Sequence, residues 1–214
     1  EERLLDLVTH LVEGVGQHAH LVAALDRHPG AVLPAGQAAG PPRQLVDGPA
    51  DLAREHGALV VTDEVYEHQT FDGVTHIPMA TVAGMAERTV TISSAGKTFS
   101  VTGWKIGWLH APAEVTAAVR AVKQFLTYVN GAPFQPAVAH ALGLGDEYFR
   151  QLAADLQRKR DVLSTGLRAA GFDVFPSSGT YFVVADAAPL GYDDGMDLCL
   201  RLPDLVGVAA VPVA

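Results

Sequence analysis

Cysteine, basic residues and long apolar runs are all scarce in this chain of 214 residues, and each scarcity excludes a class of protein. The single cysteine, Cys199, cannot form an internal disulfide framework and is typical of a reducing, cytoplasmic environment. Lysine and arginine number 15 against 24 acidic residues, and the net charge of −9 argues against nonspecific nucleic-acid binding. Without a run of about 18 apolar residues or a basic-then-apolar leader, we expect neither a membrane span nor a secretory signal.

The composition otherwise indicates a packed globular protein. Hydrophobic residues make up 49% of the chain, which is enough to build a sizeable core. The nine histidines are scattered, and neither a CxxC pair nor an HExxH motif is present. We therefore predict no metal site, including at the four histidines of the N-terminal region, His10, His18, His20 and His28.

Residues 1–50 differ in composition from the rest of the chain, because they contain no Lys, Phe, Tyr, Trp, Ile, Met, Ser or Asn. Helical apolar spacing predicts a helix over Glu1–Val15 and a second helix-like piece at His20–Leu25, followed by a loop rich in proline and glycine. Two interpretations stay open for this atypical segment. It is either a surface helix with a linker, or a stretch translated out of frame, and sequencing the gene distinguishes them.

From Asp51 the pattern is that of an α/β protein. Asp51–Gly57 is typical of a helix end closed by glycine, and Ala58–Thr62 is a continuous apolar run that predicts a buried parallel strand. Asp63 ends this strand, at the edge where open α/β sheets bind ligands. The alternative role for Asp63 is to cap the next segment, and the alternative for Tyr66 is a core aromatic.

The stretch Thr89–Trp108, TVTISSAGKTFSVTGWKIGW, combines a strand with an isolated lysine. Its alternating β-branched residues predict a short strand that runs into small hydroxylated residues and then Lys97. A partly desolvated lysine loses its proton readily, and the neutral amine attacks carbonyl carbons. Small neighbours leave room for a flat cofactor, whereas hydroxyls and a second lysine, Lys105, suit a phosphate. Taken alone, such a lysine is more commonly a solvated surface residue.

The segment SAGKTFSVTGWKIGW, from Ser94 to Trp108, resembles the cofactor-binding segment of class I/II, fold-type I, pyridoxal phosphate-dependent aminotransferases. The kynurenine/glutamine and N-succinyldiaminopimelate branches are the most similar. The resemblance implies that Lys97 condenses with pyridoxal 5'-phosphate and is the catalytic base. It also implies that Asp63 pairs with the ring nitrogen, Tyr66 with the 3-oxygen, and Ser94 and Lys105 with the phosphate. For Lys105, the alternative is a lysine at the edge of a strand over Trp104–His110.

The same resemblance implies a fold and a domain organisation. We expect an incomplete α/β chain with an atypical segment at 1–50, part of the cofactor-binding large domain at 51–160, and the start of the C-terminal small domain at 161–214. Further expected elements are helices at Thr81–Met85, from Pro112 onward and over Asp146–Gly171, then strands at Phe172–Phe175 and Thr180–Ala185.

The resemblance implies an enzyme that moves an amino group from an amino acid to a 2-oxo acid, as a homodimer when complete. The carboxylate-binding arginine and the asparagine that contacts the 3-oxygen find no match here, because Arg201 lies outside the motif and Gly40–Arg43 stands where the asparagine loop belongs. Three alternatives stay open: an inactive remnant, an oligomerising module, and β-lyase chemistry on the same site.

Overall fold

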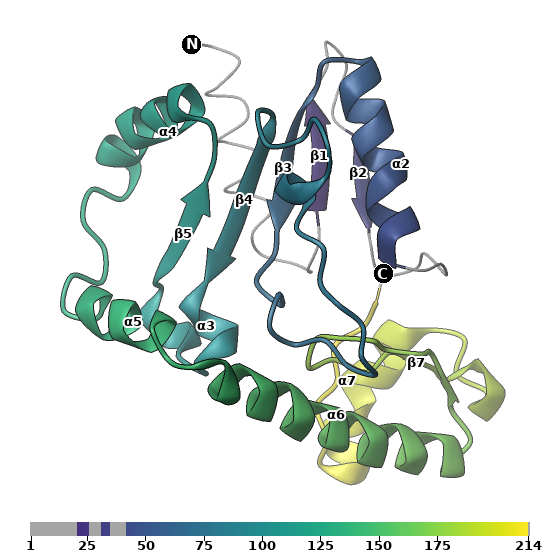
Figure 1. Cartoon of the computed structure of the whole chain (residues 1–214). Coiled ribbons are helices and arrows are strands. Elements are labelled where there is room, and N and C mark those ends of the chain that lie inside the picture. The colour runs from purple at the N-terminus through teal and green to yellow at the C-terminus, as the bar shows by residue number, and fades with distance from the viewer. Residues whose placement is uncertain (1–20, 26–30, 35–41, 214) are drawn as a thin grey trace.

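Five strands form a mixed sheet in the computed structural model, which describes residues 21–25, 31–34 and 42–213 (Figure 1). The spatial order is β2-β1-β3-β4-β5, and the strands are β1 (Leu21–Leu25), β2 (Ala31–Pro34), β3 (Leu59–Asp63), β4 (Thr89–Ser94) and β5 (Gly107–His110). Only β3 and β4 run parallel, whereas the β1–β2, β1–β3 and β4–β5 pairs are antiparallel. The parallel pair brings the carboxyl ends of β3 and β4 to one edge of the sheet.

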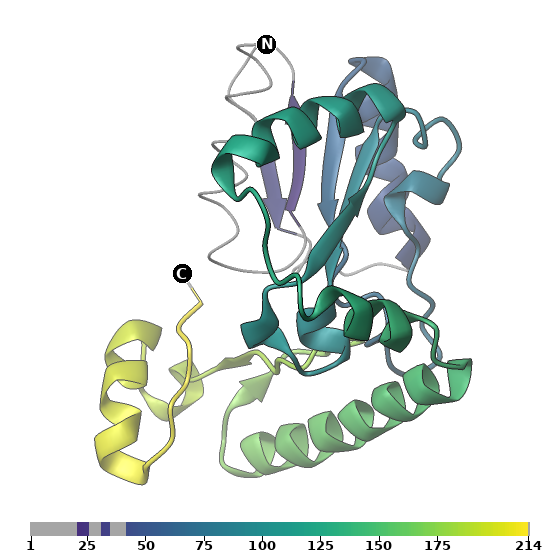
Figure 2. The ribbon, with the colours of Figure 1, turned by 90° about the vertical axis from the view of Figure 1, so that its left-hand side faces the viewer.

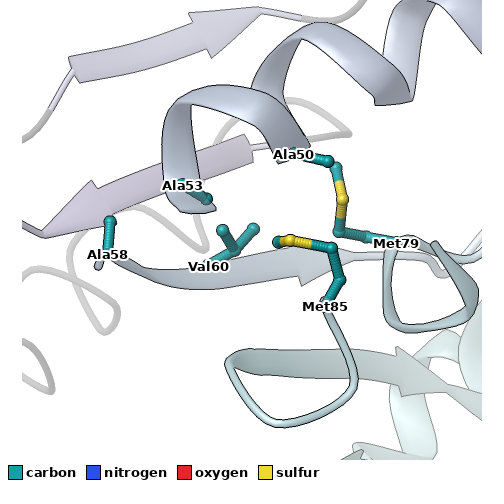
Figure 3. Close-up of a cluster of buried hydrophobic side chains, with 6 residues drawn as sticks. All are labelled: Ala50, Ala53, Ala58, Val60, Met79 and Met85. Atoms are coloured by element: carbon teal, nitrogen blue, oxygen red, sulfur yellow. The ribbon is translucent and has the colours of Figure 1, made fainter. Parts of the chain in front are cut away.

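The alternation of side chains along β3 divides the core between the two faces of the sheet. Val60 packs with Ala50 and Ala53 of helix α2 (Pro42–Glu55) and with two methionines, Met79 and Met85 (Figure 3). On the other face, the buried Val61 and Val90 form a cluster against which helix α4 (Ala113–Leu126) packs through Val115. Because neighbouring residues of a strand point to opposite faces, this single strand holds a helix on each side.

Residues 135–213 lie beyond the carboxyl ends of β3 and β4 (Figures 1 and 2). Three short helical turns precede or follow strands: η2 (Met79–Thr81), α3 (Ala95–Thr98) and η3 (Thr102–Trp104). The C-terminal elements are α5 (Gln135–Leu142), α6 (Asp146–Ala169), the paired strands β6 (Asp173–Val174) and β7 (Ala185–Asp186), η4 (Ala188–Leu190) and α7 (Gly195–Val206). The long helix α6 therefore carries the chain from the sheet to the β6–β7 unit.

Several predictions from periodicity and turn residues are confirmed. The buried parallel strand, the strand before Lys97, and the helices α4 and α6 form as expected. Helix α2 ends just before Gly57, the glycine that the sequence indicated as its end. Gly57 has φ +63°, and the Ala58 amide donates to the Ala53 carbonyl at 2.9 Å. Asp51 lies within this helix, which begins at Pro42, as expected for a segment that forms a helix end.

Four predictions of local structure were wrong. The helix-like piece at His20–Leu25 is strand β1, whose backbone pairs with both β2 and β3. The helix at Thr81–Met85 is replaced by η2 and successive turns, interrupted where Gly84 has φ +72°. The other two errors concern strand length. The strand at Trp104–His110 starts only at Gly107, and only Ala185 of the strand at Thr180–Ala185 is in β7.

A few predictions fall outside the described residues or were not tested. The helix at Glu1–Val15 and the four histidines of the N-terminal region lie outside the described part of the chain. The proposed division at residue 160 stays a prediction, although α6 runs through that position without a break. Helix α7 was not predicted at all.

Candidate functional site

The two parallel strands deliver the candidate site residues to the same edge of the sheet. Asp63 is the last residue of β3, and its neighbour in the parallel register is Ile92 of β4. Strand β4 ends at Ser94, and α3 begins directly after it, so that Lys97 lies in the first turn beyond the strand. The sequence suggested a loop at Lys97, whereas a four-residue helical turn holds this lysine.

Lys97 contacts Tyr181, which packs in turn against Tyr66. Its Nζ donates a hydrogen bond to the Tyr181 hydroxyl at 2.6 Å and lies 5.1 Å from the centre of that ring. Tyr66 is buried, and its ring meets the Tyr181 ring edge-on with centroids 5.5 Å apart. The structure therefore brings together Lys97 and Tyr66, two of the residues named from the sequence, with Tyr181 between them.

The two tyrosine hydroxyls have opposite electrostatic surroundings. Burial raises the pKa of Tyr66, and its hydrogen bond to Tyr181, an ionised Tyr181 and the Asp63 carboxylate raise it further. Burial also acts to raise the pKa of Tyr181, but hydrogen bonds from Lys97 and Tyr66 outweigh it and leave this pKa below its ordinary value. Tyr181 is therefore the hydroxyl of the pair that ionises first.

Asp63 caps the turn that follows its own strand. Its Oδ1 accepts a hydrogen bond from the Val65 amide at 3.1 Å, so the capping role left open by the sequence is present in the structure. The carboxylate is half-buried, and its charge acts on the Tyr66 hydroxyl. Asp63 thus belongs to the same group of residues as Tyr66.

Ser94 and Lys105 lie on the side of α3 where β4 pairs with β5. A Cβ added at Gly96 would lie 3.5 Å from the Ser94 Oγ, which places this hydroxyl beside the turn that carries Lys97. Lys105 is exposed and has a left-handed backbone with φ +56°, and its carbonyl accepts from Asn130 Nδ2 at 2.8 Å. Lys105 therefore lies in a turn ahead of β5 and not on a strand edge.

A cavity of about 430 Å³ opens beside Lys97. It is lined by Gln69, Gly96, Lys97, Ser100, Thr102, Gly103, Leu152, Leu156 and Tyr181. The Gln69 side chain is 1% exposed, and its Oε1 has no hydrogen-bond partner among the described residues. An unpaired buried acceptor is costly, so it indicates room for a donor from a bound molecule. Asp63, Ser94 and Lys105 are not among the lining residues.

Sequence reasoning missed Tyr181 and Gln69 because neither carries a local signal. From the sequence, Tyr181 was one of the residues of the predicted strand at Thr180–Ala185. In the structure it contacts Lys97, which is 84 residues away in the sequence. Gln69 lies in no motif that the sequence analysis identified, and it is almost completely buried. Within the described ranges, no helix is long and apolar enough to cross a membrane, and no three His, Cys, Asp or Glu side chains gather as a metal site would require.

Comparisons with known proteins find extensive similarity. The family model described as aminotransferase class I and II matches residues 38–214. A probable N-succinyldiaminopimelate aminotransferase of Mycobacterium tuberculosis is 55% identical over 165 residues, which are 77% of this chain and 42% of that protein. A kynurenine–oxoglutarate transaminase of Dictyostelium discoideum is 44% identical over 154 residues, which are 69% of this chain and 35% of that protein.

Solved structures give the same result for the fold. The N-succinyldiaminopimelate aminotransferase of Mycobacterium tuberculosis superposes with a TM-score of 0.77 at 54% identity, over 79% of this chain and 44% of that one. An aspartate aminotransferase of Thermus thermophilus superposes with a TM-score of 0.72 at 33% identity, over 80% of this chain and 44% of that one. This chain spans less than half the length of the curated relatives named here.

Proposed function

The chain belongs to the class I and II aminotransferase family, and from this premise we propose that its protein transfers an amino group from an amino acid to a 2-oxo acid. The cofactor that the family implies is pyridoxal 5'-phosphate. The observation that carries the proposal is the position of Lys97, whose amine lies at the wall of a cavity of about 430 Å³ beyond the end of β4. This volume falls within the range of small-molecule sites.

The residues around the cavity fit such a cofactor by their chemistry. A primary amine, Gln69 and three hydroxyl-bearing residues, Ser100, Thr102 and Tyr181, line it together with two glycines. At Gly96 a Cβ would come within 3.2 Å of the Thr102 Cα, so a side chain there would require the Thr102 backbone to shift by a few tenths of an ångström. When bound, pyridoxal phosphate supplies an aldehyde that condenses with an amine and a ring that withdraws electrons.

The chain's own residues then have distinct roles. Lys97 would hold the cofactor through its neutral amine and would move protons as base and acid. Asp63 would support a positive charge on the ring nitrogen, and Tyr66 would donate to the 3-oxygen. Ser94 and Lys105 would hold the phosphate as donor and cation, and the Lys105 side chain is exposed.

A homodimer is part of the proposal. Large apolar side chains are exposed at the end of α4 and in the loop toward α5, including Phe125 at 86% and Tyr128 at 76%. Contiguous exposed apolar surface is typical of an interaction site, and a second copy of the chain is the partner that the family implies.

Reductive labelling tests the proposed function. We expect pyridoxal phosphate followed by borohydride to leave a stable pyridoxyl group on Lys97, identified by peptide mass spectrometry. The variant Lys97→Arg should lose the label, whereas Lys123→Arg on α4 should retain it. Unlabelled Lys97 in folded wild-type chain would exclude the proposal.

A further inference from the structure

The loop that follows Tyr66 is bonded to the turn between β6 and β7. Thr70 and Gly179 form an antiparallel bridge, and the Thr180 amide donates to the Gln69 carbonyl at 2.8 Å. A Cβ at Gly179 would lie 2.8 Å from that same carbonyl oxygen, so the two backbones approach as closely as glycine allows. Because Tyr181 follows directly in the chain, this contact determines where its ring lies.

The Tyr181 hydroxyl accepts hydrogen bonds from two sides. Lys97 donates from Nζ at 2.6 Å, and Tyr66 donates its own hydroxyl proton. The edge-on packing of the two tyrosine rings holds the acceptor in this position. The hydroxyl therefore lies at one wall of the cavity and touches the amine that the proposed function makes reactive.

We propose that Tyr181 positions the Lys97 amine at the wall of the cavity and holds it as an ammonium in the cofactor-free chain, an inference that rests on the proposed function of Lys97. The ammonium donates to the Tyr181 oxygen, and a hydrogen bond to the charged form of a group stabilises that form. The neutral amine is the form that attacks a carbonyl carbon, so this hydrogen bond keeps the cofactor-free amine in its unreactive form.

The ionisation of Tyr181 supports the same arrangement. The titratable groups that face it are Lys97 and Tyr66, and Asp63 acts on Tyr66. The pKa of Tyr181 is lowered, so its phenolate forms more readily than that of an isolated tyrosine and is a weaker base. An anionic oxygen beside Nζ stabilises the ammonium further.

Reductive methylation of the cofactor-free chain tests the proposal without any enzymatic readout. At mildly alkaline pH, formaldehyde and cyanoborohydride modify neutral amines, and mass spectrometry compares Lys97 with Lys123 in the same sample. We expect Tyr181→Phe to raise the Lys97 to Lys123 ratio about tenfold, the effect of losing one hydrogen bond that stabilises a charged group. In Tyr192→Phe the ratio should stay at the wild-type value.

A second pair of variants tests the backbone contact while Tyr181 is retained. Gly179→Ala should displace the turn from the Gln69 carbonyl, move Tyr181 away from Lys97 and raise the same ratio. Gly166→Ala in α6, where a Cβ meets nothing within 4 Å, should leave the ratio unchanged. Absorbance titration of the five tyrosines adds a pH profile: Lys97→Met should raise the midpoint of the one that titrates below its ordinary pKa, and Tyr181→Phe should abolish that transition.

A Lys97 to Lys123 ratio that is unchanged in Tyr181→Phe overturns the proposal, whatever the glycine variants do. An unchanged tyrosine titration in Lys97→Met overturns it as well. These outcomes are distinguishable from failure of the proposed function. If pyridoxal phosphate leaves no label on Lys97 while the ratio still rises in Tyr181→Phe, the proposed function fails, and the contact of Lys97 with Tyr181 is retained.

Discussion

The carboxylate of Glu64 connects the end of β3 to the loop that follows it. Glu64 is 3% exposed and accepts from the Thr62 hydroxyl at 2.8 Å, from His76 Nε2 at 2.8 Å and from the Met79 amide at 3.2 Å. Burial alone raises the pKa of Glu64, but the hydrogen bonds from His76 and Thr62 outweigh it, so the pKa is lowered. This residue therefore fixes the backbone next to Asp63 and brings Met79 into the core.

We predict that Glu64→Gln lowers the free energy of unfolding by about 1–3 kcal/mol near neutral pH, the usual value for hydrogen bonds to a charged group. Because the folded-state pKa is below the ordinary 4.5, the stabilisation is complete above 4.5 and is lost as the pH falls through the folded value. The difference from wild type should therefore shrink in acid. Urea unfolding at several pH values measures this, with the exposed Glu87→Gln as control, and equal stability at neutral pH would refute the prediction.

At the scale of elements, helix α6 is attached to the site through Arg160. This side chain is 13% exposed, and its guanidinium pairs with Asp72 at 2.5 and 3.0 Å and donates to the Ser177 carbonyl at 2.6 Å. It also lies over the Phe71 ring, 5.0 Å from the centroid. One residue of α6 thus holds both the loop after Tyr66 and the turn that leads to Tyr181.

Two arginines of α6 offer a matched comparison. We expect Arg160→Gln to lower the free energy of unfolding by about 2 kcal/mol, because it removes charged hydrogen bonds from a nearly buried site. We expect Arg158→Gln to lower the free energy of unfolding by less than about 0.5 kcal/mol, because the Arg158 side chain is 71% exposed and pairs only with Asp155 of the same helix among the described residues. Urea midpoints of the two variants decide the matter, and similar losses in both would argue against a special role for Arg160.

At the scale of the whole molecule, the distribution of apolar surface is uneven. The faces of β3 are covered by α2 and α4, yet the end of α4 and the loop after it expose Phe125, Leu126, Tyr128 and Val129 at 59% or more. This cluster of four is larger than the exposed pair Val162 and Leu163 on α6, which are 71% and 50% exposed.

We predict that the chain self-associates through this cluster. Light scattering over a range of concentrations should show a dimer or larger species for the wild type. The double variant Phe125→Ser with Tyr128→Ser should shift the population toward monomer, because it removes apolar surface that association buries. The single variant Val162→Ser should behave as wild type. A wild-type chain that remains monomeric and melts cooperatively would contradict the prediction.

Much of the fold followed from the sequence wherever the signal was local. Periodicity and β-branched runs identified β3, β4, α4 and α6, and Gly57 marked the end of α2, because each of these patterns reports which side chains a nearby core can bury. Strand β1 could not be identified in this way, since five apolar residues suit a helix or a strand equally well. Pairing with β2 and β3 decided its conformation.

For the candidate site, the sequence alone determined the types of side chain and their order: Asp63 and Tyr66 after one strand, Lys97 after the next. A motif of that length specifies a chemistry because each residue supplies a different functional group at a set spacing. Only the tertiary structure decided that Tyr181 contacts Lys97 and that the Gln69 side chain is buried without a partner. Contacts between residues far apart in the chain depend on how the elements pack, which a local pattern does not encode.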